Sequence, residues 1–142
     1  MEVKNTWTDD DFSEMGWHDN YIHSIIFPGN DYTMTFDIDY IFKWELVKEK
    51  NLYNFWISPV LLMFKNVSNL KIDIDFENSI GLDIVELKRV NSRPSPNGKL
   101  TIQDYIINTD KGLITFESTG FVQKVKKQPI FTSSQWLPRA EL

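Results

Sequence analysis

The chain has 142 residues, enough for one domain whose core buries about two-thirds of the surface that the unfolded chain exposes. With 42% hydrophobic, 14% aromatic and 25% charged residues, its composition excludes a disordered protein. No cysteine is present, which excludes disulfide frameworks and thiolate metal sites and favours a cytoplasmic location. We therefore predict a single domain over residues 1–142.

The net charge of −5 is unevenly distributed, because residues 1–87 carry 16 acidic and 6 basic side chains whereas residues 88–142 carry 4 and 9. The short basic run at residues 124–127 comes without a nucleic-acid-binding signature, so no nucleic-acid partner is expected. The apolar run at residues 55–64 has about half the length that a membrane-spanning helix needs and contains Pro59. We expect a buried strand there and no membrane association.

The first predicted element is a short helix in DDDFSEM, residues 9–15. Thr8 can cap this helix, and Gly16 can end it. The three aspartates in its first turn lie at the positive end of the helix dipole, where negative charge is stabilising. A β-hairpin follows, in which YIHSIIF at residues 21–27 is joined through the turn sequence PGND to a long strand over residues 32–46. In that strand every second residue is apolar: Tyr32, Met34, Phe36, Ile38, Tyr40, Phe42, Trp44 and Leu46. The alternation predicts one buried face along the whole strand.

Residues 54–65 are apolar on both faces and should lie in the middle of a sheet, with Pro59 at a bulge or bend. Residues 70–76 alternate again and predict a half-buried strand. Residues 82–90 favour a strand, with a helical turn as the alternative, and NSRPSPNG at residues 91–98 reads as a loop. Residues 100–107 and 113–125 flank NTDKG and predict a second hairpin.

These elements predict an all-β protein, a curved antiparallel sheet or β-sandwich of about seven to nine strands with one short N-terminal helix. No βαβ rhythm is present, so a nucleotide-binding α/β fold is not expected.

Both histidines of the chain lie in WHDNYIH, residues 17–23. His18 and His23 are five residues apart, which on a strand places them on opposite faces, so they cannot both bind one metal ion there. A metal site would need one of them together with Asp19, Asp37 or Asp39. We favour a structural turn, in which Asp19 or Asn20 bonds free backbone groups and Trp17 anchors the chain.

Two strands share an acidic pattern, FDIDY at residues 36–40 and IDIDF at residues 72–76. If the strands were neighbours, Asp37, Asp39, Asp73 and Asp75 would form a carboxylate ladder that needs solvent, nearby lysines or a divalent cation. A solvated acidic face is favoured over a calcium site. Such a face would also suit a protein partner with a basic surface, because complementary charge speeds association.

Four segments between Trp17 and Leu137, namely WHDNYIHSIIF, FDIDYIFKW, FWISPVLLMFKNVSNLKIDI and ITFESTGFVQKVKKQPIFTSSQWL, resemble a group of small uncharacterised bacterial proteins. That group has a W-H-D-N-x-I-H start, an hDIDYI strand and a G-F-x-Q ending. The resemblance implies a bacterial cytosolic protein and supplies no catalytic residue. More loosely, FKNVSNLKI is similar to a segment of small immunity-type proteins that neutralise toxins by binding them.

The leading functional hypothesis is a non-catalytic binding or protein-interaction module, immunity-like in its mode of action, and no cofactor is assigned. The alternative is a small hydrolase or a metal- or ligand-binding protein centred on residues 17–23 with Asp37 and Asp39. A third hypothesis is a structural subunit whose sheet edges pair in a homodimer. The candidate binding residues are Trp17, His18, Asp19, His23, Asp37, Asp39, Asp73 and Asp75, and none is assigned as catalytic or as a metal ligand.

Overall fold

A computed structural model describes residues 1–139, which form ten β-strands and one 3-10 helix, η1. The elements are β1 (Thr6–Thr8), η1 (Asp9–Glu14), β2 (Tyr21–Ile26), β3 (Met34–Val47), β4 (Leu52–Lys65), β5 (Ser68–Ile74), β6 (Ile84–Pro94), β7 (Thr101–Thr109), β8 (Gly112–Ser118), β9 (Gly120–Val125) and β10 (Ile130–Thr132). One antiparallel sheet has the order β1-β9-β4-β3-β2, with β10 also paired to β4, and the second has the order β5-β8-β7-β6.

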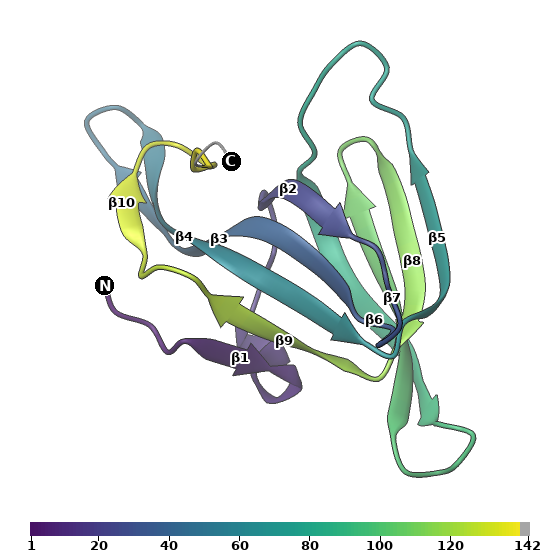
Figure 1. Cartoon of the computed structure of the whole chain (residues 1–142). Coiled ribbons are helices and arrows are strands. Elements are labelled where there is room, and N and C mark those ends of the chain that lie inside the picture. Colours follow the sequence, from purple (N-terminus) through teal and green to yellow (C-terminus); the bar gives the residue numbers. More distant parts are fainter. Residues whose placement is uncertain (140–142) are drawn as a thin grey trace.

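The two sheets pack face to face, as Figure 1 shows, and the predicted predominantly β architecture with one short N-terminal helix is confirmed. The strands number ten for two reasons. β1 and β10 have three residues each, too few for an alternation pattern to reveal, and the single strand predicted over residues 113–125 is divided into β8 and β9, which belong to different sheets. The helix is a 3-10 helix, and at its start the backbone N–H of Thr8 donates to Asp11 Oδ2 at 2.8 Å.

The predicted hairpin of β2 and β3 is present, with Ile22 opposite Ile38 and Ile26 opposite Thr35. Along the first half of β3 the alternation holds, because the side chains of Met34, Phe36, Ile38 and Tyr40 are all buried in the core. The apolar face predicted for this part of the strand is therefore observed.

In the second half of β3 the prediction of a single buried face is wrong. A bulge between Ile41 and Lys43 shifts the pairing with β4, so that Trp44 lies opposite Phe55. Because one extra residue reverses the faces of a strand, Trp44 and Leu46 now share the outer face with Asp37 and Asp39. The side chains of Trp44 and Leu46 are exposed.

Strand β4 lies inside the six-stranded sheet, as its apolar run predicts. One edge pairs with β3, and the other pairs first with β10 and then with β9. Pro59 lies opposite Asp39 in unbroken register, and its carbonyl accepts the Lys126 N–H at 2.9 Å. The N–H and C=O of a strand residue point toward the same neighbouring strand. Proline has no N–H, and at Pro59 the missing donor would point into the gap between β10, which pairs with residues 55–57, and β9, which pairs from residue 60 onward. The bulge predicted at Pro59 is therefore absent there, and the bulge between β3 and β4 lies on β3, between Ile41 and Lys43.

The second sheet contains the chain from β5 to β8. Residues 84–94 are a strand, which settles the alternative left open for residues 82–90, and β6 extends through the first four residues of the predicted loop. The second hairpin, β7 and β8, turns between Thr109 and Gly112. At Gly120 the chain returns to the first sheet with φ +141, and a Cβ there would collide with the Asp9 carboxylate.

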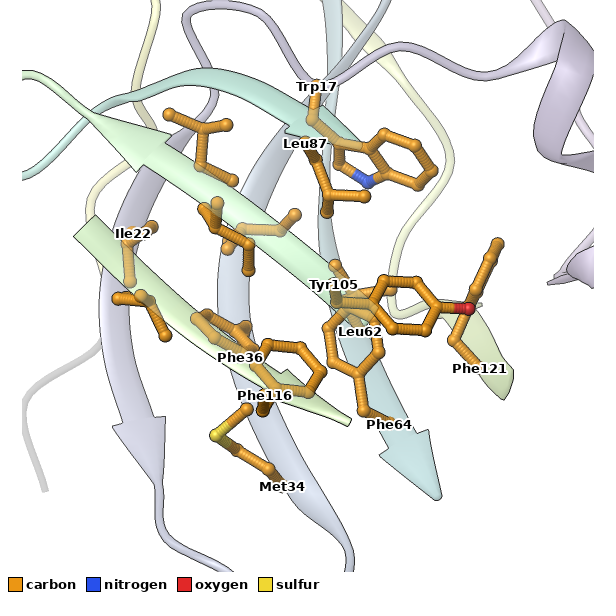
Figure 2. Packing of buried hydrophobic residues seen from close by; sticks show 14 of the residues in the cluster. Trp17, Ile22, Met34, Phe36, Leu62, Phe64, Leu87, Tyr105, Phe116 and Phe121 are labelled. Atoms are coloured by element: carbon orange, nitrogen blue, oxygen red, sulfur yellow. The ribbon is translucent and has the colours of Figure 1, made fainter. Parts of the chain in front are cut away.

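Aromatic rings from both sheets fill the core, as Figure 2 shows. The Phe64 ring lies 5.0 Å from that of Tyr105 and 4.7 Å from that of Phe116, measured between centroids. Such rings bury about 150–250 Å² each, and burial of this apolar area holds the two sheets together.

Candidate functional site

Trp17, the first residue of the WHDNYIH stretch, belongs to the core. Its side chain is 3% exposed, and its ring contacts those of Phe12, Tyr40 and Phe121. The indole Nε1 donates to Gln123 Oε1 at 2.9 Å. Because these contacts leave the ring closed to solvent, Trp17 anchors the chain at its entry to β2 and does not form part of a surface site.

The turn that follows is built by Asn20 more than by Asp19. The N–H of Asn20 donates to the Trp17 carbonyl at 3.1 Å, and its side-chain Oδ1 accepts the Ile41 N–H at 3.4 Å. Asp19 adopts φ +64, a left-handed conformation that aspartate tolerates better than most residues. His18 is exposed, with Nδ1 2.9 Å from the Val85 carbonyl oxygen.

His23 contacts one of the predicted aspartates directly. A bulge between Ile22 and Ser24 leaves His23 without a partner of its own on β3 and redirects its side chain. Its Nε2 lies 2.6 Å from Asp39 Oδ2. Asp39 is 0% exposed, and the same Oδ2 accepts the Leu137 N–H at 2.7 Å.

The carboxylates of Asp37 and Asp39 form salt bridges with cationic side chains of the chain itself. The Nη2 of Arg139 lies 2.7 Å from Asp39 Oδ1 and 3.0 Å from Asp37 Oδ1, and Lys126 Nζ lies 3.0 Å from the same Asp37 oxygen. Burial alone would raise the pKa of Asp37, but the hydrogen bonds and charges of Arg139 and Lys126 outweigh it and hold this pKa below its ordinary value. These carboxylates are therefore already neutralised.

This pairing bears on the metal and hydrolase alternatives. The Arg139 guanidinium occupies the place between the two carboxylates where a metal ion would sit, and no group of three or more ligand side chains within residues 1–139 is arranged to hold one. A hydrolytic site would need a nucleophile hydrogen-bonded to the oriented histidine. The partner of His23 in the described chain is Asp39, and no hydroxyl is bonded to the ring.

The second acidic pair lies elsewhere. Asp73 and Asp75 lie at the end of β5, an edge strand of the four-stranded sheet, and β3 belongs to the other sheet. The strands are not neighbours, so the four aspartates form no common ladder. Asp73 and Asp75 are both exposed.

Asp75 instead belongs to a cluster of carboxylates from three segments, which we call the acidic end: Asp19, Asp75, Glu77, Asp83 and Asp110. In Figure 1 the loop between β5 and β6, which carries Glu77, rises beside the β7–β8 turn, which carries Asp110. Backbone contacts join these segments, since the N–H of Asp83 donates to Asp110 Oδ1 at 3.0 Å and the N–H of Asp75 donates to the Lys111 carbonyl at 3.0 Å.

The charge of the acidic end is only partly compensated. Burial, and then the carboxylates of Asp110 and Asp19, raise the pKa of Asp83, while Lys111 opposes them. Lys111 Nζ lies 3.1 Å from Asp110 Oδ2. Unlike Asp37 and Asp39, the carboxylates of Asp75, Glu77 and Asp83 form no salt bridge with a cation within residues 1–139.

Two large apolar side chains project from the same loop. Phe76 is 46% exposed and Ile80 is 93% exposed. Phe76 contributes to a hollow of about 500 Å³, whose other lining residues are Asp75, Glu77, Ser79, Asp110 and Lys111. Apolar side chains inside a charged rim are a common arrangement at protein interfaces.

Comparison with protein-family models, curated proteins and solved structures finds no match to this chain. Across residues 1–139 there is also no helix with the length and apolarity to cross a membrane. The site is therefore interpreted from its own chemistry. The sequence analysis did not identify Asp83, Asp110, Phe76, Ile80 and Arg139 as site residues. The acidic residues repeated from Asp73 to Asp83, with apolar residues between them, were a pattern that could have identified Phe76, Ile80 and Asp83.

Proposed function

We propose that the protein is a non-catalytic protein-binding module that holds a partner with a basic surface at the acidic end. The observation that carries this proposal is the exposure of Phe76 and Ile80 beside carboxylates that the chain neutralises only in part. Complementary charge would speed the encounter and set the orientation, and the two apolar side chains would supply anchors that bury on contact.

Such a surface suits a protein that neutralises a basic toxin by covering it, which is the immunity-like role to which the sequence resemblance pointed. The proposal places the protein in the cytoplasm, supported by the lack of cysteine. His23 and Asp39 have a structural role in it, because His23, Leu137 and Arg139 together bind both carboxylate oxygens of Asp39.

The test uses a synthetic amphipathic peptide of alternating lysine and leucine, with a glutamate-leucine peptide of the same length as its control. Calorimetry should show binding of the lysine peptide that weakens as salt is added. Asp75→Asn/Glu77→Gln/Asp110→Asn should weaken it about tenfold or more, and Ile80→Ala should weaken it without changing its salt dependence.

A matched control neutralises three exposed carboxylates elsewhere, Glu2, Glu14 and Glu49. This variant has the same net charge as the acidic-end variant and should bind as the unmodified protein does. An equal loss of peptide binding in both variants would mean that binding depends only on net charge. Unchanged binding in the acidic-end variant would show that this surface is not the binding site.

A further inference from the structure

The outer part of the β3–β4 hairpin, residues 42–56, extends past the end of β2 beside β10 (Figure 1). We call it the arm. On its β4 edge, Phe55 and Trp56 pair with β10. On its β3 edge, β2 ends its pairing opposite Asp39, and residues 42–47 have no partner strand in the described chain. An unpaired edge of this kind is a template for another strand.

The arm also exposes apolar side chains beside this edge. Trp44 is 38% exposed, with the His18 ring stacked on it at a centroid distance of 6.3 Å, and Leu46 and Tyr53 are exposed as well. Trp44 lies opposite Phe55 and Leu46 opposite Tyr53 in the β3–β4 ladder, so these side chains share one face. An apolar face next to a free strand edge is a combination that soluble proteins normally avoid unless something covers it.

We propose that a second copy of this chain covers the edge, with β3 pairing antiparallel to β3 of the second copy about a two-fold axis at Trp44. In this register Lys43 of each copy lies opposite Glu45 of the other, and Trp44 lies opposite Trp44. The interface is isologous, so each contact occurs twice.

Charge decides among the registers. An axis at Glu45 places Glu45 opposite itself, and an axis at Lys43 places Lys43 opposite itself, each a like-charge pair in direct opposition. An axis between Trp44 and Glu45 places Lys43 opposite Leu46 and mixes the charged face with the apolar face. Lys43 and Glu45 already lie on one face of the arm, with Nζ and Oε1 3.2 Å apart, so the Trp44 register joins two complementary charge pairs.

The structure also sets where the ladder stops. The Asn20 side chain accepts the N–H of Ile41, which closes the β3 edge at that residue. On the same side, the bulge at Phe42 interrupts the alternation of the strand, so the pairing covers residues 43–45 of each copy. This surface is separate from the acidic end, and the dimer does not depend on the partner proposed for that end.

Sedimentation of the full chain from about 10 to about 500 μM tests the proposal, since association of this kind rises with concentration. The unmodified protein is expected to form a dimer. Lys43→Glu and Glu45→Lys each turn two attractive pairs into repulsive ones and should raise the dimer Kd about tenfold or more. Lys50→Glu, in the turn of the arm and outside the ladder, is the matched charge control and should dimerise as the unmodified protein does.

A mixture of the two single variants identifies the register. In the Trp44 register a strand with two acids meets a strand with two bases, so Lys43→Glu and Glu45→Lys should form a mixed dimer although neither dimerises well alone. The double variant Lys43→Glu/Glu45→Lys should regain self-association for the same reason. Circular dichroism confirms that each variant is folded.

Three results would overturn the proposal: an unmodified protein that is monomeric over the whole range, single variants that dimerise as it does, or folded single variants that do not associate in the mixture. A dimer lost through the acidic-end variant but kept in both arm variants would also overturn it.

Discussion

Arg139→Gln is expected to lower the free energy of unfolding by about 2–3 kcal/mol at neutral pH. The guanidinium lies 2.7 Å from Asp39 Oδ1, and Asp39 has no exposed surface. Removing the guanidinium leaves the Asp39 charge buried with less compensation. Leu137, which packs beside Ile41, Phe55 and Ile57, is held by the same carboxylate and should lose part of its order.

The expected loss of unfolding free energy depends on the partners that each carboxylate retains in the variant. Breaking a buried ion pair costs about 3–5 kcal/mol when the remaining charge has no other partner. Asp39 keeps His23 and the Leu137 N–H, which reduces the cost below that range. Asp37 is partly exposed and keeps Lys126, so its lost contact adds less than about 1 kcal/mol.

Urea unfolding followed by tryptophan fluorescence measures the effect, with exposed Lys127→Gln as the control. In an Asp39→Asn background the cost of Arg139→Gln should fall by about 1–2 kcal/mol, because the charge that the guanidinium compensates is gone. A cost below about 0.5 kcal/mol in the unmodified background, or full additivity in the double variant, would refute the reasoning.

Trp17→Ala should destabilise the protein by about 4 kcal/mol in the same assay, because it empties a ring-sized space and removes the partner of Gln123 Oε1; a loss under about 1.5 kcal/mol would contradict its placement in the core. The pH dependence of stability should have opposite signs at two carboxylates. The lowered pKa of Asp37 means that its ionised form stabilises the fold above the ordinary carboxyl pKa and that this contribution is lost as the pH falls through the lowered value. Asp37→Asn should therefore cost stability at pH 7 and progressively less as the pH falls below the ordinary carboxyl pKa. The raised pKa of Asp83 means that its ionisation opposes folding, so Asp83→Asn should stabilise at pH 7 and lose this advantage as the pH falls through the raised value; two variants with parallel pH profiles would contradict both assignments.

The strands were predictable from the sequence wherever apolar side chains on one side of the chain alternate with polar side chains on the other. The alternation from Met34 to Tyr40 is of this kind. Beyond Ile41 the sequence continues the same pattern through Phe42, Trp44 and Leu46, and the bulge that reverses the faces leaves no trace in it. Alternation identifies a strand but does not show where an extra residue interrupts the pairing.

The candidate site was predictable only in part, because its members meet across long sequence separations. Asp37 and Asp39 read as a solvated face, yet the segment around Leu137 and Arg139, about a hundred residues later, folds over them. The acidic end joins Asp19 to Asp83 and Asp110 in the same way. Such contacts depend on how the two sheets are connected, which local patterns do not encode.

The six-stranded sheet draws its strands from both ends of the described chain. β1 pairs with β9, with Thr6 opposite Lys124, and the Gln128 side chain bonds both the N–H and the carbonyl of Val3. During synthesis on a ribosome, β1 must therefore wait unpaired until residues 120–128 emerge, and β4 has no neighbour on that side in the meantime. This sheet can therefore be completed only after β9 has been synthesised, and until then one edge of the long apolar strand β4 stays unpaired over residues 60–65.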